Sequence, residues 1–155
     1  MKISKNKGAA DPLEGVEVRR SKVHGQGVFA VRSYRAGDTI GRYAGRRYGP
    51  GEHHAGWDDR LTYLFALSDG STIDGAQGGN AIRHINHACM PNVEAIERRA
   101  ANGGLELMVR ATRRIRAGDE LFLDYALIIG GEDPTEYACA CGTGACRGTM
   151  AAVFA

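Results

Sequence analysis

Hydrophobic residues along this chain occur in short stretches, either alternating with polar residues or filling a few consecutive positions, and few stretches follow the period of a helix. Alternation at residues 16–18 predicts a first strand, and the apolar run at 28–31 predicts a buried one. Residues 39–45 predict a third strand, which follows an Arg-Ala-Gly-Asp turn at 35–38. The pattern therefore favours a protein built from many short strands.

Two hairpins are predicted further along the chain. Residues 63–67 and 71–74 flank a Ser-Asp-Gly turn, and residues 92–97 and 105–111 flank an Asn-Gly-Gly turn. Glycine-containing turns between two apolar stretches are typical of β-hairpins. We therefore expect each pair of stretches to form two antiparallel strands.

The rest of the pattern predicts a loop, a short helical stretch and a last strand. Residues 48–59 contain Gly-Pro-Gly and predict a loop, and a short helical stretch is expected after Asn80. Residues 120–125 predict the last strand, after a second Arg-Ala-Gly-Asp turn at 116–119. One matched turn does not establish a repeat architecture.

Composition agrees with a single turn-rich β domain. The chain has 155 residues, of which 43% are hydrophobic and 25% charged, so one domain with a real core is expected. Glycine occurs 22 times and proline only 4 times, which favours many turns. The net charge of +2 is too small to argue for nucleic acid binding, so no direct nucleic acid partner is predicted.

No apolar run approaches the roughly 18 residues that a membrane-spanning helix needs, so no membrane partner is predicted. Residues 1–10 are basic but lack the apolar stretch of a secretory signal peptide. We therefore expect a cytoplasmic protein, with export by another route, as an effector acting in a host cell, left open. Composition and compactness favour a bacterial source.

Four cysteines form the clearest chemical pattern. Cys139, Cys141 and Cys146 follow the spacing C-x-C-x4-C, and Cys89 is the only cysteine outside this tail. Four thiolates from two places in the chain can form a complete tetrahedral zinc site. A disulfide or unrelated buried thiols are the alternatives, but disulfides suit small secreted chains. We therefore predict a structural zinc site.

Cys89 lies in a segment, residues 83–92, that also holds Asn86 and His87 beside a proline-fixed turn. We expect zinc to pin the tail onto this turn, with an active site beneath it. A glycine loop at 24–27 could present backbone groups to a ligand. An ordinary tight turn is the alternative for this loop, since it lacks the spacing of a dinucleotide site.

Taken together, these stretches resemble the SET-domain protein lysine methyltransferases over residues 16–150. Seven motifs occur in the order that this family has. They are the G-x-G turn at Gly25 and Gly27, Tyr43-Ala44-Gly45, Tyr63-Leu64-Phe65, Ile73-Asp74 with Gly79-Asn80, Arg83-x-x-Asn86-His87-x-Cys89-x-Pro91-Asn92, Gly118-Asp119-Glu120-Leu121-x-x-Asp124-Tyr125, and the tail cysteines with Cys146-Arg147-Gly148.

The resemblance implies a mainly β fold of small sheets, in which the C-terminal segment threads under a preceding loop to form a pseudoknot. A flexible N-terminal tail (1–14), a SET domain (15–126) and a zinc-clipped post-SET segment (127–155) are the expected parts. S-adenosylmethionine, the methyl donor, would occupy a pocket on one face. The substrate lysine would enter a narrow channel from the other face.

The resemblance also assigns roles to individual residues. Tyr125 and Tyr43 would be the catalytic tyrosines, which orient the amine, although a core tyrosine with a satisfied hydroxyl is the alternative for each. Tyr43, Tyr63, Leu123 and Tyr125 would line the lysine channel. The residues expected to bind the donor are His24, Gly25, Gln26, Gly27, Tyr63, Arg83, Asn86, His87 and Tyr137, and the metal ligands are Cys89, Cys139, Cys141 and Cys146.

Two departures from the family pattern carry information. His84 stands where the family usually has an aromatic residue, so the local packing differs. Leu123 stands where the family commonly has Phe or Tyr, and a hydroxyl there would hold a water that limits the number of methyl groups. Because leucine cannot hold that water, we expect dimethylation or trimethylation.

The predicted partner is a protein substrate with an exposed lysine in a basic segment, such as a histone or a histone-like protein. Two other functions stay open. One is a donor-binding or zinc-clipped interaction module without turnover. The other is a methyltransferase that acts on something other than protein lysine. The oligomeric state is not predicted.

Overall fold

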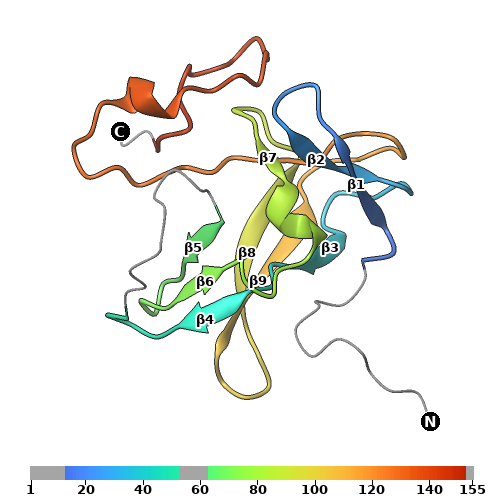
Figure 1. Cartoon of the computed structure of the whole chain (residues 1–155). Helices are drawn as coiled ribbons and strands as arrows, with labels where there is room; N and C mark the ends of the chain where they lie inside the picture. Colours follow the sequence, from blue (N-terminus) through green and yellow to red (C-terminus); the bar gives the residue numbers. More distant parts are fainter. Residues whose placement is uncertain (1–12, 53–62, 153–155) are drawn as a thin grey trace.

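The computed structural model describes residues 13–52 and 63–152 (Figure 1). Within them, short strands form four small sheets, and helix is limited to two 3-10 turns, which confirms the predicted mainly β fold. The elements are β1 (Val16–Arg20), β2 (Gln26–Ala30), β3 (Thr39–Arg42), β4 (Arg46–Tyr48), β5 (Leu64–Ala66), β6 (Thr72–Asp74), η1 (Ala81–His84), β7 (Asn86–His87), β8 (Val93–Arg99), β9 (Leu105–Ala111), β10 (Phe122–Leu123) and η2 (Pro134–Tyr137).

Both predicted hairpins are present. β5 pairs with β6 and β8 pairs with β9, each antiparallel and joined by the glycine-containing turn that the sequence indicates. β9 also pairs with β3, and β6 also pairs with β4, so that each hairpin is extended into a three-stranded sheet. A third sheet consists of β1 and β2 alone.

The strand predicted at residues 39–45 is divided between two sheets. β3 ends at Arg42, and a separate strand, β4, begins at Arg46, inside the region that we expected to lead into a loop. Gly45 lies so close to the neighbouring backbone that an added Cβ would stand 2.2 Å from the carbonyl oxygen of Asp74. This close approach turns the chain from one sheet to the other. Residues 53–59 of the predicted loop lie outside the described residues.

The two Arg-Ala-Gly-Asp turns lie side by side. Tyr34 and Ile115, the residues before the turns, exchange both backbone hydrogen bonds at 2.9 and 3.0 Å. Within each turn, the aspartate side chain accepts the N–H of the arginine at 2.8 or 2.9 Å. The backbone N–H of Gly37, in the first turn, donates to the carbonyl of Ala111, where the strand before the second turn ends. In the same way, the N–H of Gly118, in the second turn, donates to the carbonyl of Ala30, where the strand before the first turn ends. The matched sequences therefore form a matched pair of structures.

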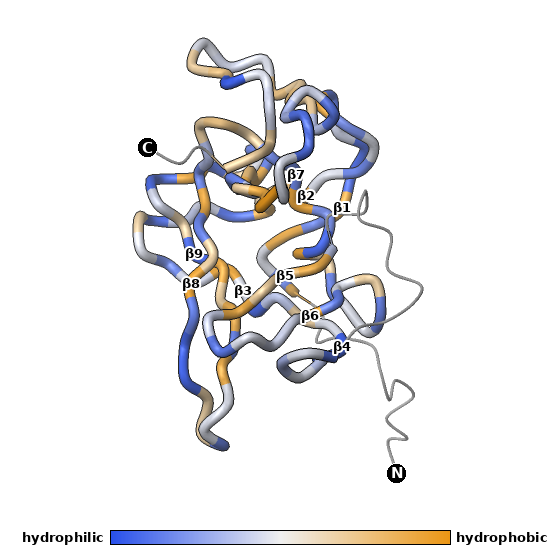
Figure 2. Tube along the Cα trace, turned by 90° about the vertical axis from the view of Figure 1, so that its left-hand side faces the viewer, coloured by the Kyte–Doolittle hydropathy of each residue, from blue (hydrophilic) through white to orange (hydrophobic). Residues whose placement is uncertain are grey.

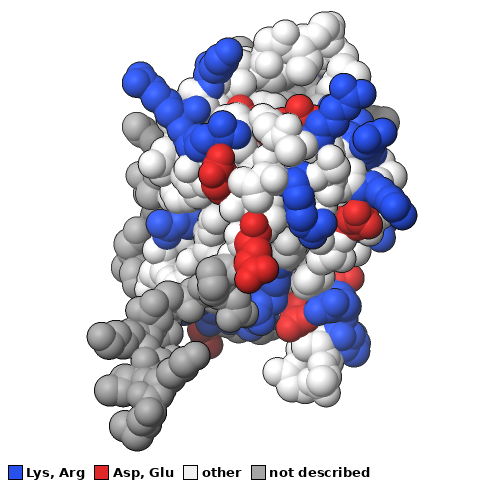
Figure 3. Space-filling model, turned by 90° about the vertical axis from the view of Figure 1, so that its right-hand side faces the viewer, with Lys and Arg blue, Asp and Glu red and all other residues white. Residues whose placement is uncertain are grey.

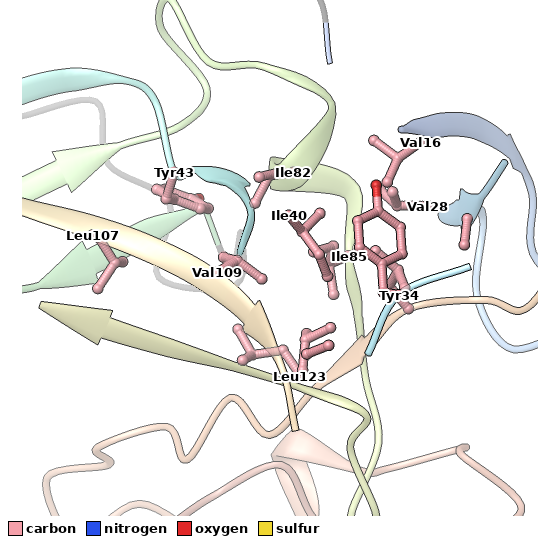
Figure 4. Close-up of a cluster of buried hydrophobic side chains, with 14 of the residues drawn as sticks. Val16, Val28, Tyr34, Ile40, Tyr43, Ile82, Ile85, Leu107, Val109 and Leu123 are labelled. Atoms are coloured by element: carbon pink, nitrogen blue, oxygen red, sulfur yellow. The ribbon is translucent and has the colours of Figure 1, made fainter. Parts of the chain in front are cut away.

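The hydrophobic core lies between the β1–β2 sheet, the β3–β9 pair and η1 (Figure 4). Hydrophobic positions gather near the centre of the molecule, whereas the end of β8 is hydrophilic (Figure 2). η1 begins at Asn80, whose side chain accepts the N–H of Ile82 and so caps the first turn. Ile82 is thereby held in the core. Leu13, which we had placed in the flexible tail, packs against the same core; residues 1–12 lie outside the described residues.

The chain crosses itself where β10 runs parallel to β7. Asn92 holds the crossing from one side: its backbone N–H donates to the carbonyl of Phe122 at 3.1 Å, and its side-chain oxygen accepts the N–H of Phe122 at 2.8 Å. The predicted strand at 120–125 is shortened to β10 because its partner, β7, offers only two residues. This crossing is the contact that the predicted pseudoknot requires.

Residues 127–152 form an extended tail that closes on itself in the upper left part of Figure 1. Isolated bridges pair Leu127 with Ala151 and Ala138 with Thr149. Apart from η2, the described tail has no regular helix or strand, and most of its side chains are exposed. Contacts other than the packing of buried hydrophobic side chains must therefore fix the conformation of the tail.

The surface carries both signs of charge. On the face shown in Figure 3, Lys and Arg side chains are interspersed with Asp and Glu rather than gathered in a field of one sign. Among the described residues, no helix has the length and apolar character needed to cross a membrane.

Candidate active site and metal centre

The four cysteines converge at one place. Their sulfur atoms all lie within 4.8 Å of one another, with Sγ of Cys89 at 3.7 Å from Sγ of Cys139. Four sulfurs around one zinc ion at about 2.3 Å each would have this spacing. All four are free thiols, and a disulfide would need a sulfur–sulfur separation of about 2.05 Å. Of the alternatives considered, the disulfide therefore does not occur, and the geometry fits a tetrahedral metal.

The backbone around the cluster is arranged for sulfur ligands. The backbone N–H groups of Arg147 and Cys141 donate to the sulfurs of Cys89 and Cys139, at 3.3 Å each. Gly142, with a positive φ of 69°, allows the turn between the second and third tail cysteines. N–H donors aimed at sulfur favour the thiolate, which is the form that binds metal.

The cysteine thiols already differ in acidity. Burial raises the pKa of Cys139 to about 12. Burial also raises the pKa of Cys141, but hydrogen bonds from backbone N–H groups and from the hydroxyl of Thr143 outweigh it and lower that pKa to about 6. A divalent cation would remove these differences by holding all four sulfurs as thiolates.

A cavity of about 500 Å3 lies directly beside the cysteine cluster. It is open to solvent, and its volume is in the range of sites for small molecules. Three parts of the chain form its walls: the glycine loop, the β7 region and the tail. The lining residues are Val23, His24, Gly25, Gln26, Tyr63, Arg83, His84, Asn86, His87, Tyr125, Ala138, Cys139, Ala140 and Met150.

Asn86 fastens the glycine loop to the wall of this cavity. Its side-chain amide nitrogen lies at donating distance from the carbonyls of His24 and Gln26, at 3.0 and 2.9 Å, and from Oε1 of Glu120 at 3.1 Å. Gly25, between the two bonded residues, has a positive φ of 44° and open space where a Cβ would stand. The loop is therefore held at both sides of a glycine that faces the cavity.

His87 joins the cavity to the cysteine cluster. Its Nδ1 accepts the backbone N–H of Tyr125 at 3.0 Å, and its Nε2 lies 3.5 Å from Sγ of Cys89. Because Nδ1 is an acceptor, the proton of the neutral ring is on Nε2 and points to the sulfur. Burial lowers the pKa of His87, which favours this neutral form.

Tyr63 and Tyr125 line the cavity, and Tyr43 lies next to Tyr63 in the core. The hydroxyl of Tyr43 donates to the carbonyl of Tyr63 at 2.6 Å, and the hydroxyl of Tyr125 donates to the carbonyl of Ile85 at 2.5 Å. Burial, followed by the nearby phenol of Tyr125, raises the pKa of Tyr43 well above its ordinary value. The phenol of Tyr43 therefore stays protonated near neutral pH, and its oxygen can both donate and accept hydrogen bonds.

Arg83 and His84 form the rim beside Tyr63. Nε of Arg83 donates to Nε2 of His84 at 3.3 Å, and the Tyr63 and His84 rings meet edge to face at 6.3 Å. Burial, and then the charge of Arg83, lower the pKa of His84. His84 thus packs against Tyr63 as an aromatic residue would.

Several expected site residues lie elsewhere. Gly27 and Tyr137 are not among the residues that line the cavity: Gly27 packs against the carboxylate of Glu120, and the hydroxyl of Tyr137 bonds Glu132. Tyr43 forms part of the core and reaches the site only through its hydroxyl. Leu123 is 7% exposed and packs in the core.

Nothing in the sequence predicted that four of the residues would line the cavity. Val23, Ala138, Ala140 and Met150 supply apolar or small side chains to the walls, and nothing distinguishes them from ordinary loop residues. They reach the cavity only because the glycine loop and the cysteine-bearing tail fold against β7.

Comparison with known proteins identifies the family. A SET domain profile matches residues 25–126. The chain is 35% identical over 144 residues to Histone-lysine N-methyltransferase 2B of Homo sapiens, covering 86% of this chain and 5% of that protein. It is 32% identical over 134 residues to a Histone-lysine N-methyltransferase, H3 lysine-4 specific, of Mycosarcoma maydis, covering 83% of this chain and 9% of that protein.

A third similar protein is the Histone H3-lysine(4) N-trimethyltransferase ATX1 of Arabidopsis thaliana, 31% identical over 138 residues, which are 84% of this chain and 13% of that protein. This chain therefore spans only a small part of the length of these relatives. It belongs to the SET-domain family, as the sequence motifs indicate.

Proposed function

We propose that this SET-domain protein transfers a methyl group from S-adenosylmethionine to the ε-amine of a lysine in a protein substrate, and that a zinc ion bound by its four cysteines holds the tail over the donor. The observation that carries the proposal is the position of the cavity. It lies between Asn86, His87 and Tyr125 on one side and Cys139 of the cysteine cluster on the other.

The walls of the cavity suit this donor. The open backbone at Gly25 can approach the polar amino-acid part, and the guanidinium of Arg83 at the rim can pair with a carboxylate. Val23 and Met150 offer apolar contacts to a ring. When bound, S-adenosylmethionine supplies a positively charged sulfonium that carries the methyl group.

The protein's contribution to the reaction would be alignment and removal of water. Methyl transfer is an in-line displacement that needs a neutral amine, whereas the pKa of lysine in water is about 10.4. A channel walled by the phenols of Tyr43, Tyr63 and Tyr125 disfavours an ammonium because its charge would be partly desolvated. The hydroxyl of Tyr125 would orient the amine, and the oxygen of Tyr43 would accept a hydrogen bond from it.

Zinc fits the cysteine cluster in donor type, number and spacing. Its role would be structural, since four protein ligands leave no open position for a substrate. The ion would tie Cys89, next to the crossing of β7 and β10, to three cysteines of a tail that has little core of its own. Donor binding and zinc binding are then linked, because Cys139 belongs to both sites.

A basic protein segment is the substrate class that best fits the surface and the relatives. The relatives are named as histone-lysine methyltransferases. In this chain, Glu132, Asp133 and Glu136 are exposed on the tail, a few residues before Ala138 of the cavity wall, and a basic peptide would be attracted to them. A histone-like protein is therefore the first substrate to test.

The number of methyl groups follows from Leu123. Leu123 packs in the core rather than in the cavity wall, and its apolar side chain offers no hydroxyl to hold a water, so we expect room for a dimethylated or trimethylated lysine. One relative is named an N-trimethyltransferase, which agrees with this expectation. Mass spectrometry of the product decides it: a reaction that stops at monomethyl-lysine in excess donor contradicts this part of the proposal.

The experiment that tests the function is incubation of the zinc-loaded protein with methyl-labelled S-adenosylmethionine and a panel of histones and bacterial lysate proteins. Donor binding is measured in parallel by calorimetry. We expect label on lysine side chains. Donor binding without label on any protein would instead support an interaction module, and label only on a small amine or on another residue type would overturn the lysine assignment.

A further inference from the structure

Arg147 pairs with the residue that precedes Tyr125. Its NH1 and NH2 groups donate to Oδ2 and Oδ1 of Asp124, each at 2.9 Å, so the contact is bidentate. Both side chains are partly exposed, at 26% for Arg147 and 34% for Asp124. The pair joins the segment after β10 to the tail, at the position next to Cys146.

The same arginine also touches the cysteine cluster. Its backbone N–H donates to Sγ of Cys89 at 3.3 Å. Four thiolates around a divalent zinc ion carry a net charge of about −2. Arg147 therefore pairs its cation with the carboxylate of Asp124, while its backbone contacts this negative cluster.

Asp124 controls the backbone on both sides of Tyr125. Its Oδ1 accepts the N–H of Ala126 at 3.1 Å, and the same oxygen lies 3.6 Å from Nδ1 of His87, which bonds the N–H of Tyr125. Ala126 has a left-handed φ of 44°, which is strained for a residue with a side chain. The turn after Tyr125 therefore depends on where the carboxylate of Asp124 is held.

We infer that Arg147 is a positioning residue, which holds the zinc-bound tail against Asp124 and thereby sets both the tail wall of the donor cavity and the backbone of Tyr125. The catalytic consequence of this inference rests on the proposed function. Without the guanidinium, the carboxylate of Asp124 would lose its paired cation while a thiolate cluster of like charge remains on the neighbouring tail. The tail would then move away from the cavity.

A second substitution that restores donor binding can distinguish an electrostatic role of Arg147 from a packing role. Arg147→Met keeps a long side chain but removes the cation, and Asp124→Asn removes the opposing anion while its side-chain oxygen still accepts the N–H of Ala126. If repulsion is the cause, the double variant must bind the donor better than Arg147→Met alone. If Arg147 acts only by packing, adding Asp124→Asn cannot restore what is lost.

The experiment measures the donor dissociation constant by calorimetry for the zinc-loaded protein, with zinc content checked for every variant. Arg147→Met is expected to weaken donor binding by about tenfold or more, which is the size of the loss in metal affinity or activity when a side chain around a metal site is removed. The double variant is expected to recover most of that loss. Arg98→Met, which breaks a surface ion pair with Glu106 at 2.9 Å, is the matched control and should bind as the unchanged protein does.

Hydrogen exchange of the same proteins supplies a measurement that does not require turnover or a donor. The amides of Tyr125 and Ala126 should exchange faster in Arg147→Met and return toward the original rate in the double variant. A double variant that is no better than Arg147→Met in both measurements overturns the inference. Failure of the unchanged protein to bind the donor would defeat the proposed function, while the exchange result would still decide the role of Arg147.

Discussion

The imidazole Nδ1 of His87 accepts a hydrogen bond from the backbone N–H of Tyr125 at 3.0 Å, which fixes two residues that lie 38 positions apart in the chain. The opposite ring nitrogen of His87 faces the sulfur of Cys89 at 3.5 Å. One buried side chain therefore contacts the backbone of the tyrosine assigned to catalysis and a ligand of the predicted zinc site. This arrangement explains why the tail, the crossing of β7 with β10 and the cavity should respond together when one is disturbed.

Removal of zinc should loosen the tail and leave the β-sheets folded. Residues 127–152 have two isolated bridges and one 3-10 turn, so without metal ligation little else would hold them. After chelation, we expect fast hydrogen exchange in the tail, unchanged protection in β8 and β9, and loss of donor binding. Returning zinc should restore both. A tail that stays protected in the zinc-free protein would contradict a structural role for the metal.

Ala126→Gly should stabilise the protein. Ala126 is the one non-glycine residue with positive φ among the described ranges 13–52 and 63–152, and glycine adopts that backbone without strain. The free energy of unfolding should rise by roughly 1 kcal/mol in chemical denaturation. Ala117→Gly, at an exposed turn position without positive φ, is the control and should be neutral or slightly destabilising. Equal losses in the two variants would refute the strain at Ala126.

Tyr34→Phe should cost no stability. Tyr34 is 1% exposed, and its hydroxyl, which lies against Gly15, has no hydrogen-bond partner among the described residues. Removing a buried, unpaired hydroxyl should leave the free energy of unfolding unchanged or raise it by up to about 1 kcal/mol. Tyr43→Phe is the contrast, because its hydroxyl bonds the carbonyl of Tyr63, and it should lose about 1 kcal/mol. A clear loss in Tyr34→Phe would mean that a bound water satisfies this hydroxyl.

His84 should make stability fall as the solution becomes acidic. Burial, and then Arg83, lower the pKa of His84 below its ordinary value of 6.5. The folded state therefore resists protonation at this residue. Its contribution is complete above pH 6.5 and is lost as the pH falls through the lowered pKa. His84→Phe removes this contribution, so the melting temperature should decrease less between about pH 7.5 and about pH 5 than in the unchanged protein. Equal decreases would contradict the assignment.

Local chemistry explains which parts of the fold could be predicted. The Asn-Gly-Gly and Ser-Asp-Gly turns each join neighbouring stretches, so both hairpins followed from adjacent residues. The convergence of the four cysteines was predictable because thiols in that number and spacing are typical of metal ligands. β4 was missed because its partner, β6, lies far along the chain and the kink at Gly45 depends on contact with Asp74.

The same distinction applies to the site. Asn86, His87 and Tyr125 carry polar groups in motifs that a resemblance can identify, and the structure brings all three to one cavity. The pairing of Asp124 with Arg147 had no sequence signal, because it depends on where the tail returns. Met150 reaches the cavity for the same reason.

The central claim is that Tyr125 aligns a lysine amine for methyl transfer, and the most direct test compares Tyr125→Phe with the unchanged protein. Donor affinity is measured by calorimetry, and methylated lysine in a histone substrate is quantified by mass spectrometry. We predict an unchanged donor dissociation constant and a methylation rate reduced by about 100-fold or more, because only the hydroxyl is removed. Methylated lysine formed by the variant at the original rate would contradict the claim.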